Sequence, residues 1–158
     1  MLSLDGMGYQ RLTEDPVASE VPTLTALLKS GARAEGLSPA FPASTANSHA
    51  ALWTGTYAGR NGILYNSTPP LPRSEHTYTE RVVGYLSDSL TAEPIWLTAA
   101  RQGVPVVAHQ VTQIVPFLPQ TIGDRPMPGL VGVNGFQSKM FTRWRTVRPV
   151  DADVHTIP

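Results

Sequence analysis

The sequence predicts an α/β fold with a mostly parallel sheet. Three observations lead to this expectation: apolar stretches of strand type at residues 2–5 and 104–109, apolar residues at helical spacing between them, and connections marked by glycine or proline. Strands that alternate with helices are typical of sheets whose parallel strands are connected through those helices. The length of 158 residues suits one domain, so we expect a single domain over residues 1–158.

The first part of the chain is expected to form a strand, a helix and a second strand. "LSLDG" (2–6) alternates apolar and small residues before an Asp-Gly pair, which predicts a strand that ends at Asp5. "VPTLTALLKSG" (21–31) has leucines at helical spacing, a proline near its start and a glycine at its end, which predicts a helix. "ARAEGLSPAF" (32–41) is a candidate for the second short strand.

The stretch "FPASTANSHAALWTG" (41–55) is predicted to join a strand to a helix. We expect Thr45 or Ser48 to cap this helix and Gly55 to end it. The junction holds four small polar side chains: Ser44, Thr45, Asn47 and Ser48. The residues alone leave two explanations open, namely helix capping or a hydroxyl nucleophile presented at the start of a helix.

The second part of the chain continues with a helix, a strand and a long loop-rich segment. Residues 69–91 have no sustained period and are predicted to be irregular. "TAEPIWLTAARQG" (91–103) predicts a helix with Thr91 as a candidate cap, Pro94 in its first turn and Gly103 at its end. "VPVVAH" (104–109) predicts a strand. One face of the helix is expected to hold Ile95, Trp96 and Ala99. Residues 110–158 are expected to be loop-rich, with short strands or a helix in "GLVGVNGF" and "KMFTRWRTVRP".

The composition excludes several classes of site and partner. Lys plus Arg and Asp plus Glu number 12 each, so no broad basic surface indicates nucleic-acid binding. The sequence has no apolar run long enough to span a membrane, and no export or anchoring signal is visible in it. It contains no cysteine, so any metal must be bound by Asp, Glu, His or hydroxyl groups.

Asp5 and the junction at residues 44–49 are expected to face the same crevice, because ligands of open α/β sheets bind beyond the carboxyl ends of the strands. A hydroxyl needs a base or a metal ion to act as a nucleophile at neutral pH, and a helix N-terminus favours an anionic substrate. Each residue alone also has a structural explanation, since Asp5 suits an Asp-Gly turn and Thr45 suits an N-cap.

The order of these motifs is more specific than any one of them. "SLDGMG" (3–8) is followed by "VPTLTALLKSGARAEGLSPAFPASTANSHAALWTGTYAGRNGILYN" (21–66). This order resembles the start of the type I phosphodiesterase and nucleotide pyrophosphatase family, in the alkaline phosphatase superfamily. That family opens with a strand ending in Asp-Gly, a "tPnL..L...G" helix and an "[FY]P..T.pNH..L.TG..P..HGI..N" block. The resemblance is good over residues 2–66, weaker over 93–109, and negligible beyond about residue 110.

The resemblance implies a fold and a set of roles. The fold would be an alkaline-phosphatase-like three-layer sandwich, of which this chain is expected to be an incomplete N-terminal portion. Asp5 would be a ligand of one of two divalent ions, most simply Zn2+, and Thr45 the metal-bound nucleophile that forms a covalent phospho-threonine. Asn66 would bind a non-bridging phosphate oxygen. The substrate would be a small phosphodiester or nucleotide. Relatives in this family are often secreted, periplasmic or membrane-anchored.

The sequence also departs from the family pattern. The family's "pNH" reads Asn47-Ser48-His49, and Asn61 replaces the histidine of "HGI". His49 is expected on a helix face or in the core rather than at a metal.

The family's later metal ligands, an Asp-x-x-x-His element, an Asp-His pair and a last histidine, have no good match in this chain. Asp151 and His155 have the first of these spacings, but no apolar strand leads into them, and we expect a turn there. The alternative function is therefore a truncated or catalytically silent domain of the same fold that binds phosphate esters or a protein partner.

Overall fold

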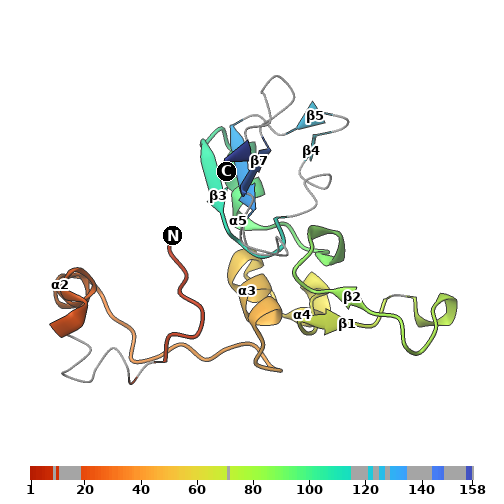
Figure 1. Ribbon diagram of the computed structural model, residues 1–158, viewed down its shortest axis with the longest axis horizontal. Coiled ribbons are helices and arrows are strands. Elements are labelled where there is room, and N and C mark those ends of the chain that lie inside the picture. Colours follow the sequence, from red (N-terminus) through yellow and green to blue (C-terminus); the bar gives the residue numbers. More distant parts are fainter. Residues whose placement is uncertain are drawn as a thin grey trace. The chain divides into compact units, whose positions relative to one another are not determined.

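The structure, a computed structural model, describes residues 1–8, 10, 19–70, 72–114, 121–122, 125–126, 129–134, 144–147 and 156–157 (Figure 1). The chain divides into two units, Met1–Ser38 and Pro39–Pro158. The described part is mixed α/β with small sheets, as expected for the fold class. In this part of the chain, no helix is both long and apolar enough to cross a membrane.

The first unit contains the predicted helix but neither predicted strand. Helix α2, Pro22–Ser30, has proline in its first turn, and the N–H of Gly31 closes it by donating to the carbonyl oxygen of Leu27 at 2.9 Å. The predictions of strands at 2–5 and 32–41 are wrong, because both segments lack strand pairing. A strand is stable only beside another strand, and the described part of this unit offers none.

The second unit contains the remaining described helices and strands (Figure 1). Its α-helices are α3 (Thr45–Thr54), α4 (Ala58–Asn61) and α5 (Ile95–Arg101). Its 3-10 turns are η2 (Arg73–Glu75) and η3 (Ser87–Ser89). Its strands are β1 (Ser67–Thr68), β2 (Val82–Val83), β3 (Val106–His109), β4 (Thr121–Ile122), β5 (Arg125–Pro126), β6 (Leu130–Asn134), β7 (Trp144–Val147) and β8 (Thr156–Ile157).

The largest sheet has the strand order β3-β6-β7-β8. Strands β3 and β6 run parallel, with Val106 opposite Leu130 and His109 opposite Val133. The pairs β6–β7 and β7–β8 are antiparallel, and so are the two-stranded ribbons β1–β2 and β4–β5. The prediction of a mostly parallel sheet is therefore wrong for the described part of the chain, where one pairing is parallel.

Helix α5 begins later than the sequence predicts. Pro94 precedes its first residue, and a proline restricts the residue before it to extended conformations, so the helix cannot continue back to Thr91. Thr91 instead donates its N–H to the carbonyl oxygen of Asn61 at 2.9 Å and its hydroxyl to that of Arg60 at 2.7 Å. The buried face of the helix also differs from the prediction and consists of Trp96, Leu97 and Ala100.

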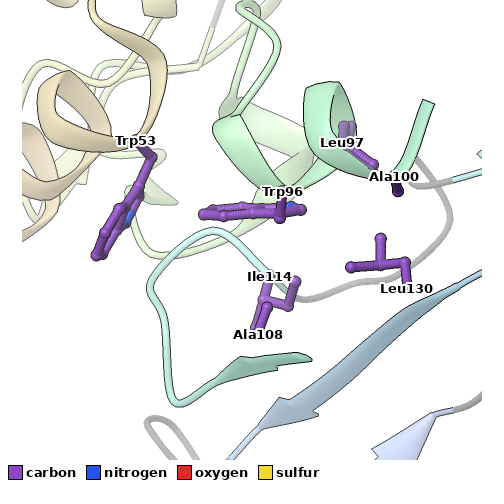
Figure 2. Close-up of a cluster of buried hydrophobic side chains, with 7 residues drawn as sticks. All are labelled: Trp53, Trp96, Leu97, Ala100, Ala108, Ile114 and Leu130. Carbon is purple, nitrogen blue, oxygen red and sulfur yellow. The ribbon is translucent and has the colours of Figure 1, made fainter. Parts of the chain in front are cut away.

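The main core lies where α5 packs against β3 and β6. Figure 2 shows the cluster, whose buried members are Trp53, Trp96, Leu97, Ala100, Ala108, Ile114 and Leu130. Trp53 comes from α3 and meets Trp96 edge to face, with ring centroids 5.9 Å apart. A second cluster joins Ala46 and Ala50 of α3 to Ile63. Helix α3 thus contributes to both clusters, which fixes its first turn within the unit.

Candidate active site at the start of helix α3

Thr45 is the first residue of helix α3. Ser44 precedes it as the N-cap residue, with an extended backbone (φ −146°, ψ 156°). The side chain of Thr45 is half-buried. The helix runs for 10 residues and ends at Gly55, whose φ of 66° is the left-handed conformation that glycine favours. The predicted helix and its end at Gly55 are therefore confirmed.

Asn66 supplies the side-chain cap of this helix. Its Oδ1 accepts a hydrogen bond from the backbone N–H of Ala46 at 2.9 Å. The side chain of Ser44 makes no capping bond, and Ser48 lies inside the helix, where its N–H donates to the carbonyl oxygen of Ser44 at 3.0 Å. The prediction that Thr45 or Ser48 caps the helix is wrong, because an amide from a distant part of the sequence takes that place.

The contact between Asn66 and Ala46 brings two predicted site residues together. Ala46 directly follows Thr45, so the side chain of Asn66 lies against the backbone that carries the Thr45 hydroxyl. Gly84 in turn donates its N–H to the carbonyl oxygen of Asn66 at 2.9 Å. Asn66 is therefore held by its side chain and by its backbone at the start of α3.

Two polar atoms beside Thr45 are buried without a hydrogen-bond partner among the described residues. They are the Oγ of Ser44 and the Oδ1 of Asn47. The other side-chain atom of Asn47, Nδ2, donates to the carbonyl oxygen of Pro42 at 2.9 Å. Asn47 therefore ties the first turn of α3 to the loop before it, which is a structural role.

His49, which keeps the histidine of the family's "pNH", and Asn61, which replaces the histidine of "HGI", both have protein partners. The Nδ1 of His49 lies 2.9 Å from the carbonyl oxygen of Thr45, and its ring lies 5.5 Å from that of Trp53. Asn61 is fully buried; its Nδ2 donates to the carbonyl oxygen of Thr56 at 2.6 Å and its Oδ1 accepts from the N–H of Ile63 at 2.9 Å.

Asp5 belongs to the first unit, separate from the unit that holds Thr45 and Asn66. It occupies a turn with Gly6, whose φ is 69° and whose N–H donates to Asp5 Oδ1 at 3.0 Å. The carboxylate is exposed. Within the described ranges, no group of three or more His, Asp or Glu residues is placed to hold a metal ion. The spaced pair Asp151 and His155 lies outside the described residues.

Sequence reasoning missed two residues that support this site, Gln113 and Gly84. The Nε2 of Gln113 donates to the carbonyl oxygens of Gly84 at 2.6 Å and Ala46 at 3.3 Å. Gly84 is buried so closely that an added Cβ would lie 2.1 Å from the carbonyl oxygen of Tyr65. A glycine inside an apolar stretch such as "VVGYL" is a known signal of close backbone approach. Gln113 follows no motif that would have singled it out.

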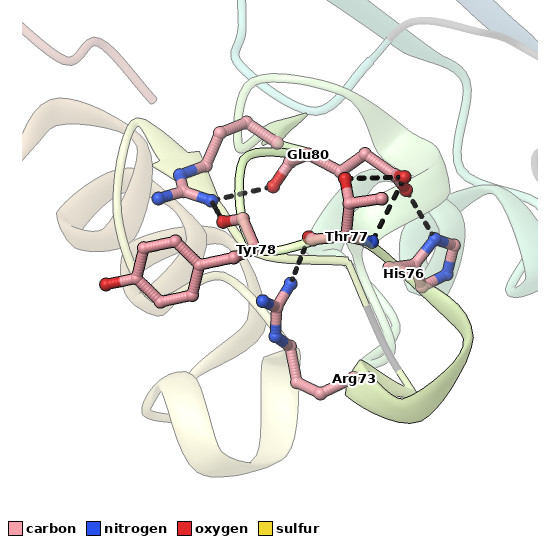
Figure 3. Close-up of polar contacts among 6 residues, drawn as sticks. Arg73, His76, Thr77, Tyr78 and Glu80 are labelled. Atoms are coloured by element: carbon pink, nitrogen blue, oxygen red, sulfur yellow. Dashed lines mark hydrogen bonds and ion pairs between the residues drawn. The ribbon is translucent and has the colours of Figure 1, made fainter.

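A second polar cluster lies in the loop at residues 73–80 (Figure 3). Both carboxylate oxygens of Glu80 accept hydrogen bonds, Oε1 from the N–H and hydroxyl of Thr77 at 3.1 and 2.9 Å, and Oε2 from His76 Nδ1 at 2.7 Å. These hydrogen bonds hold the pKa of Glu80 below its usual value. The bond from the Thr77 N–H contributes most, and those from the Thr77 hydroxyl and from His76 contribute less. This cluster organises the loop and holds no residue of the predicted site.

Comparisons with known proteins agree with the sequence resemblance. The human ectonucleotide pyrophosphatase/phosphodiesterase family member 7 (Homo sapiens) is 32% identical over 89 residues, which cover 54% of this chain and 19% of that protein. The mouse protein of the same name (Mus musculus) is 30% identical over 88 residues, which cover 54% of this chain and 20% of the mouse protein. The match thus spans about a fifth of these relatives, 19% and 20%.

No solved structure matches the chain significantly. The family profile described as type I phosphodiesterase / nucleotide pyrophosphatase matches residues 1–156, a range that includes Asp5, Thr45 and Asn66. The chain therefore belongs to the type I phosphodiesterase / nucleotide pyrophosphatase family.

Proposed function

We propose that this chain contributes the nucleophile of a metal-dependent hydrolase of phosphodiester or pyrophosphate bonds, with Thr45 as nucleophile and Asn66 as a phosphate-binding amide. One observation carries the proposal: the Asn66 side chain is bonded to the backbone N–H of Ala46, next to Thr45. Because Oδ1 of Asn66 is held by that N–H, the other end of the amide, Nδ2, has a fixed orientation. A fixed donor beside a hydroxyl is what transfer of a charged phosphoryl group requires.

The proposed reaction has two steps. The Thr45 oxygen attacks phosphorus, the bond from phosphorus to the leaving oxygen breaks, and the leaving alcohol or phosphate takes up a proton. Water then hydrolyses the phospho-threonine, which returns the Thr45 hydroxyl and releases the phosphate product. Asn66 Nδ2 donates to a non-bridging oxygen in both steps, and the N-terminus of the 10-residue helix α3 favours the anionic substrate.

Two divalent ions, most simply Zn2+, are proposed as cofactors on family grounds. Asp5 and the Thr45 hydroxyl offer oxygen atoms that suit such ions, but two donors fall short of the three or four that zinc takes from a protein. The described residues contain no group of three His, Asp or Glu that could complete the set, so further ligands are required. When bound, the ions would supply Lewis-acid stabilisation of the attacking and leaving oxygens. The complete alkaline-phosphatase-like sandwich is likewise proposed from family membership.

The experiment compares two neighbouring hydroxyls. We would assay the full-length protein with Zn2+ against an aryl phosphodiester such as bis(4-nitrophenyl) phosphate. Thr45→Ala should lower kcat by about 10³-fold or more, the scale seen when a nucleophile is removed. Ser44→Ala is the matched control, since its hydroxyl makes no capping bond, and it should retain activity within a few-fold. Equal activity of Thr45→Ala and the unmodified protein would overturn the assignment.

The second candidate function is a catalytically silent domain that binds phosphate esters or a protein partner. It is favoured by the lack of a three-ligand metal group among the described residues. A protein that binds a phosphate ester such as 4-nitrophenyl phosphate but hydrolyses neither this compound nor a phosphodiester, with Zn2+ present, would support it over the hydrolase. Turnover that depends on both Thr45 and added metal would exclude it.

A further inference from the structure

We propose that Gln113 is a positioning residue, which holds the Asn66 amide against the first turn of helix α3. The consequence for catalysis rests on the function proposed above, whereas the positioning itself is a property of the fold. Gln113 lies 67 residues after Ala46, and it reaches the start of α3 from the segment that follows strand β3.

Four hydrogen bonds form a closed ring around the start of the helix. The N–H of Ala46 donates to Asn66 Oδ1 at 2.9 Å, and the N–H of Gly84 donates to the carbonyl oxygen of Asn66 at 2.9 Å. Gln113 Nε2 donates to the carbonyl oxygen of Gly84 at 2.6 Å and to that of Ala46 at 3.3 Å, which closes the ring. Both ends of Asn66, its side chain and its carbonyl group, are therefore fixed through Gln113.

Gln113 is itself held rigidly. Its side chain is 1% exposed, and both hydrogens of Nε2 are used in the ring. Its Oε1 accepts from the hydroxyl of Thr112, which in turn accepts from Trp53 Nε1 at 2.9 Å. Its N–H donates to the carbonyl oxygen of Tyr85 at 2.8 Å, and its backbone has a positive φ of 60°. A non-glycine residue in this conformation is uncommon and marks a local constraint.

The ring leaves little room for another arrangement. An added Cβ at Gly84 would lie 2.1 Å from the carbonyl oxygen of Tyr65 and 3.2 Å from the Cβ of Ala46. Glycine and alanine at these two positions allow the backbones to approach closely enough for one glutamine side chain to bond both. A buried amide whose donors and acceptor are all satisfied rigidifies its surroundings, because losing one of these bonds leaves a buried polar group without that partner.

The test replaces Gln113 by an apolar side chain of similar length and compares it with a matched buried amide. Gln113→Met removes both ring donors, and Asn61→Leu is the control, since Asn61 is 0% exposed, bonds two backbone groups and takes no part in the ring. Native-state hydrogen exchange of the Ala46 amide is read by NMR in both proteins, relative to amides of α5. Gln113→Met should speed Ala46 exchange about tenfold or more, as expected when about one hydrogen bond is lost. Asn61→Leu should change it less than about twofold.

Activity gives the second readout. In Gln113→Met, kcat against the aryl phosphodiester should fall about tenfold or more, while KM should change less than about twofold. The reason is that a misplaced Asn66 weakens binding of the transition state more than binding of the substrate. In Asn61→Leu both constants should stay within about twofold. An equal fall of kcat in the two variants would mean that Gln113 acts only through stability, and it would overturn the positioning role.

Two further outcomes separate this inference from the proposed function. If the unmodified protein hydrolyses no phosphodiester but Ala46 exchange responds to Gln113→Met alone, the ring stands and the proposed function falls. If Gln113→Met fails to fold, exchange of the Gln113 side-chain Nε2 hydrogens in the unmodified protein decides. Slow exchange supports the ring, and exchange at the rate of a free amide overturns it.

Discussion

The side-chain oxygen of Asn66 accepts the hydrogen bond of the Ala46 N–H at 2.9 Å, although 20 residues separate the two in sequence. This contact gives one amide group two separable tasks. Its oxygen satisfies a backbone donor in the first turn of helix α3, which is a structural task. Its nitrogen is the atom proposed to donate to a phosphate oxygen, which is a catalytic task.

Asn66→Asp should separate the two tasks. Aspartate keeps the oxygen that accepts from Ala46, and its negative charge suits a helix N-terminus, so the free energy of unfolding should change by less than about 0.5 kcal/mol. The substitution removes the nitrogen donor and places a negative charge beside the phosphate, so kcat should fall by about 10²–10³-fold or more. Urea unfolding and the phosphodiester assay measure the two effects.

Asn66→Leu is the comparison for that prediction. It removes the capping oxygen as well as the donor, so it should cost about 0.5–2 kcal/mol of stability in addition to the loss of activity. If Asn66→Asp and Asn66→Leu destabilise the protein equally, the contact with Ala46 contributes nothing to the cap.

Gly84→Ala should be strongly destabilising. Its new Cβ would lie 2.1 Å from the carbonyl oxygen of Tyr65, so the backbone must shift, and we expect a loss of about 1–3 kcal/mol or more. Gly59→Ala is the matched control, because a Cβ there meets nothing within 4 Å and the residue lies in helix α4. That change should be neutral or stabilising by about 0.5–1 kcal/mol. Equal melting temperatures of the two variants would refute the close approach at Gly84.

Local signals predicted helices α2 and α3 and strand β3 of this protein, whereas the two strands expected in residues 2–5 and 32–41 are not found. Proline at the start of α2 and the left-handed glycine at the end of α3 are determined by neighbouring residues, and both are found where the sequence places them. The turn at Asp5 and Gly6 is also local and is present. The strand predicted before Asp5 depends on a partner strand elsewhere in the chain, and alternation of apolar residues does not provide one.

The candidate site was predicted only in part, for a similar reason. Family resemblance named Thr45 and Asn66, and the structure places the Asn66 side chain beside the residue that follows Thr45. The family resemblance gave no sign that Asn66 caps α3 in place of the nearby hydroxyls, nor that Gln113 joins Ala46 to Gly84. These contacts join segments distant in sequence, so no local pattern encodes them.

The two tryptophans of the core should respond differently to replacement by phenylalanine. Trp53 Nε1 donates to the Thr112 hydroxyl at 2.9 Å, whereas Trp96 Nε1 is buried with no partner among the described residues. Trp53→Phe therefore loses a buried hydrogen bond as well as packing, and it should cost about 1 kcal/mol more than Trp96→Phe. Chemical unfolding of both variants measures the difference. A double-mutant cycle with Thr112→Val should find coupling for Trp53 and none for Trp96.

The pKa of Glu80 should lie below its usual value in the folded protein. The N–H of Thr77 is the first cause, followed by the Thr77 hydroxyl and His76, since all three stabilise the ionised carboxylate (Figure 3). A folded-state pKa below the unfolded one means that this contribution to stability is complete above the unfolded pKa. It is lost as the pH falls through the folded pKa. The carboxyl ¹³C shift of Glu80, followed against pH, reports the midpoint of its titration. Thr77→Val keeps the backbone donor but removes the hydroxyl, so it should raise the pKa of Glu80 part of the way toward the usual value. A midpoint equal to that of glutamate in an unstructured peptide would show that the loop cluster does not form in solution.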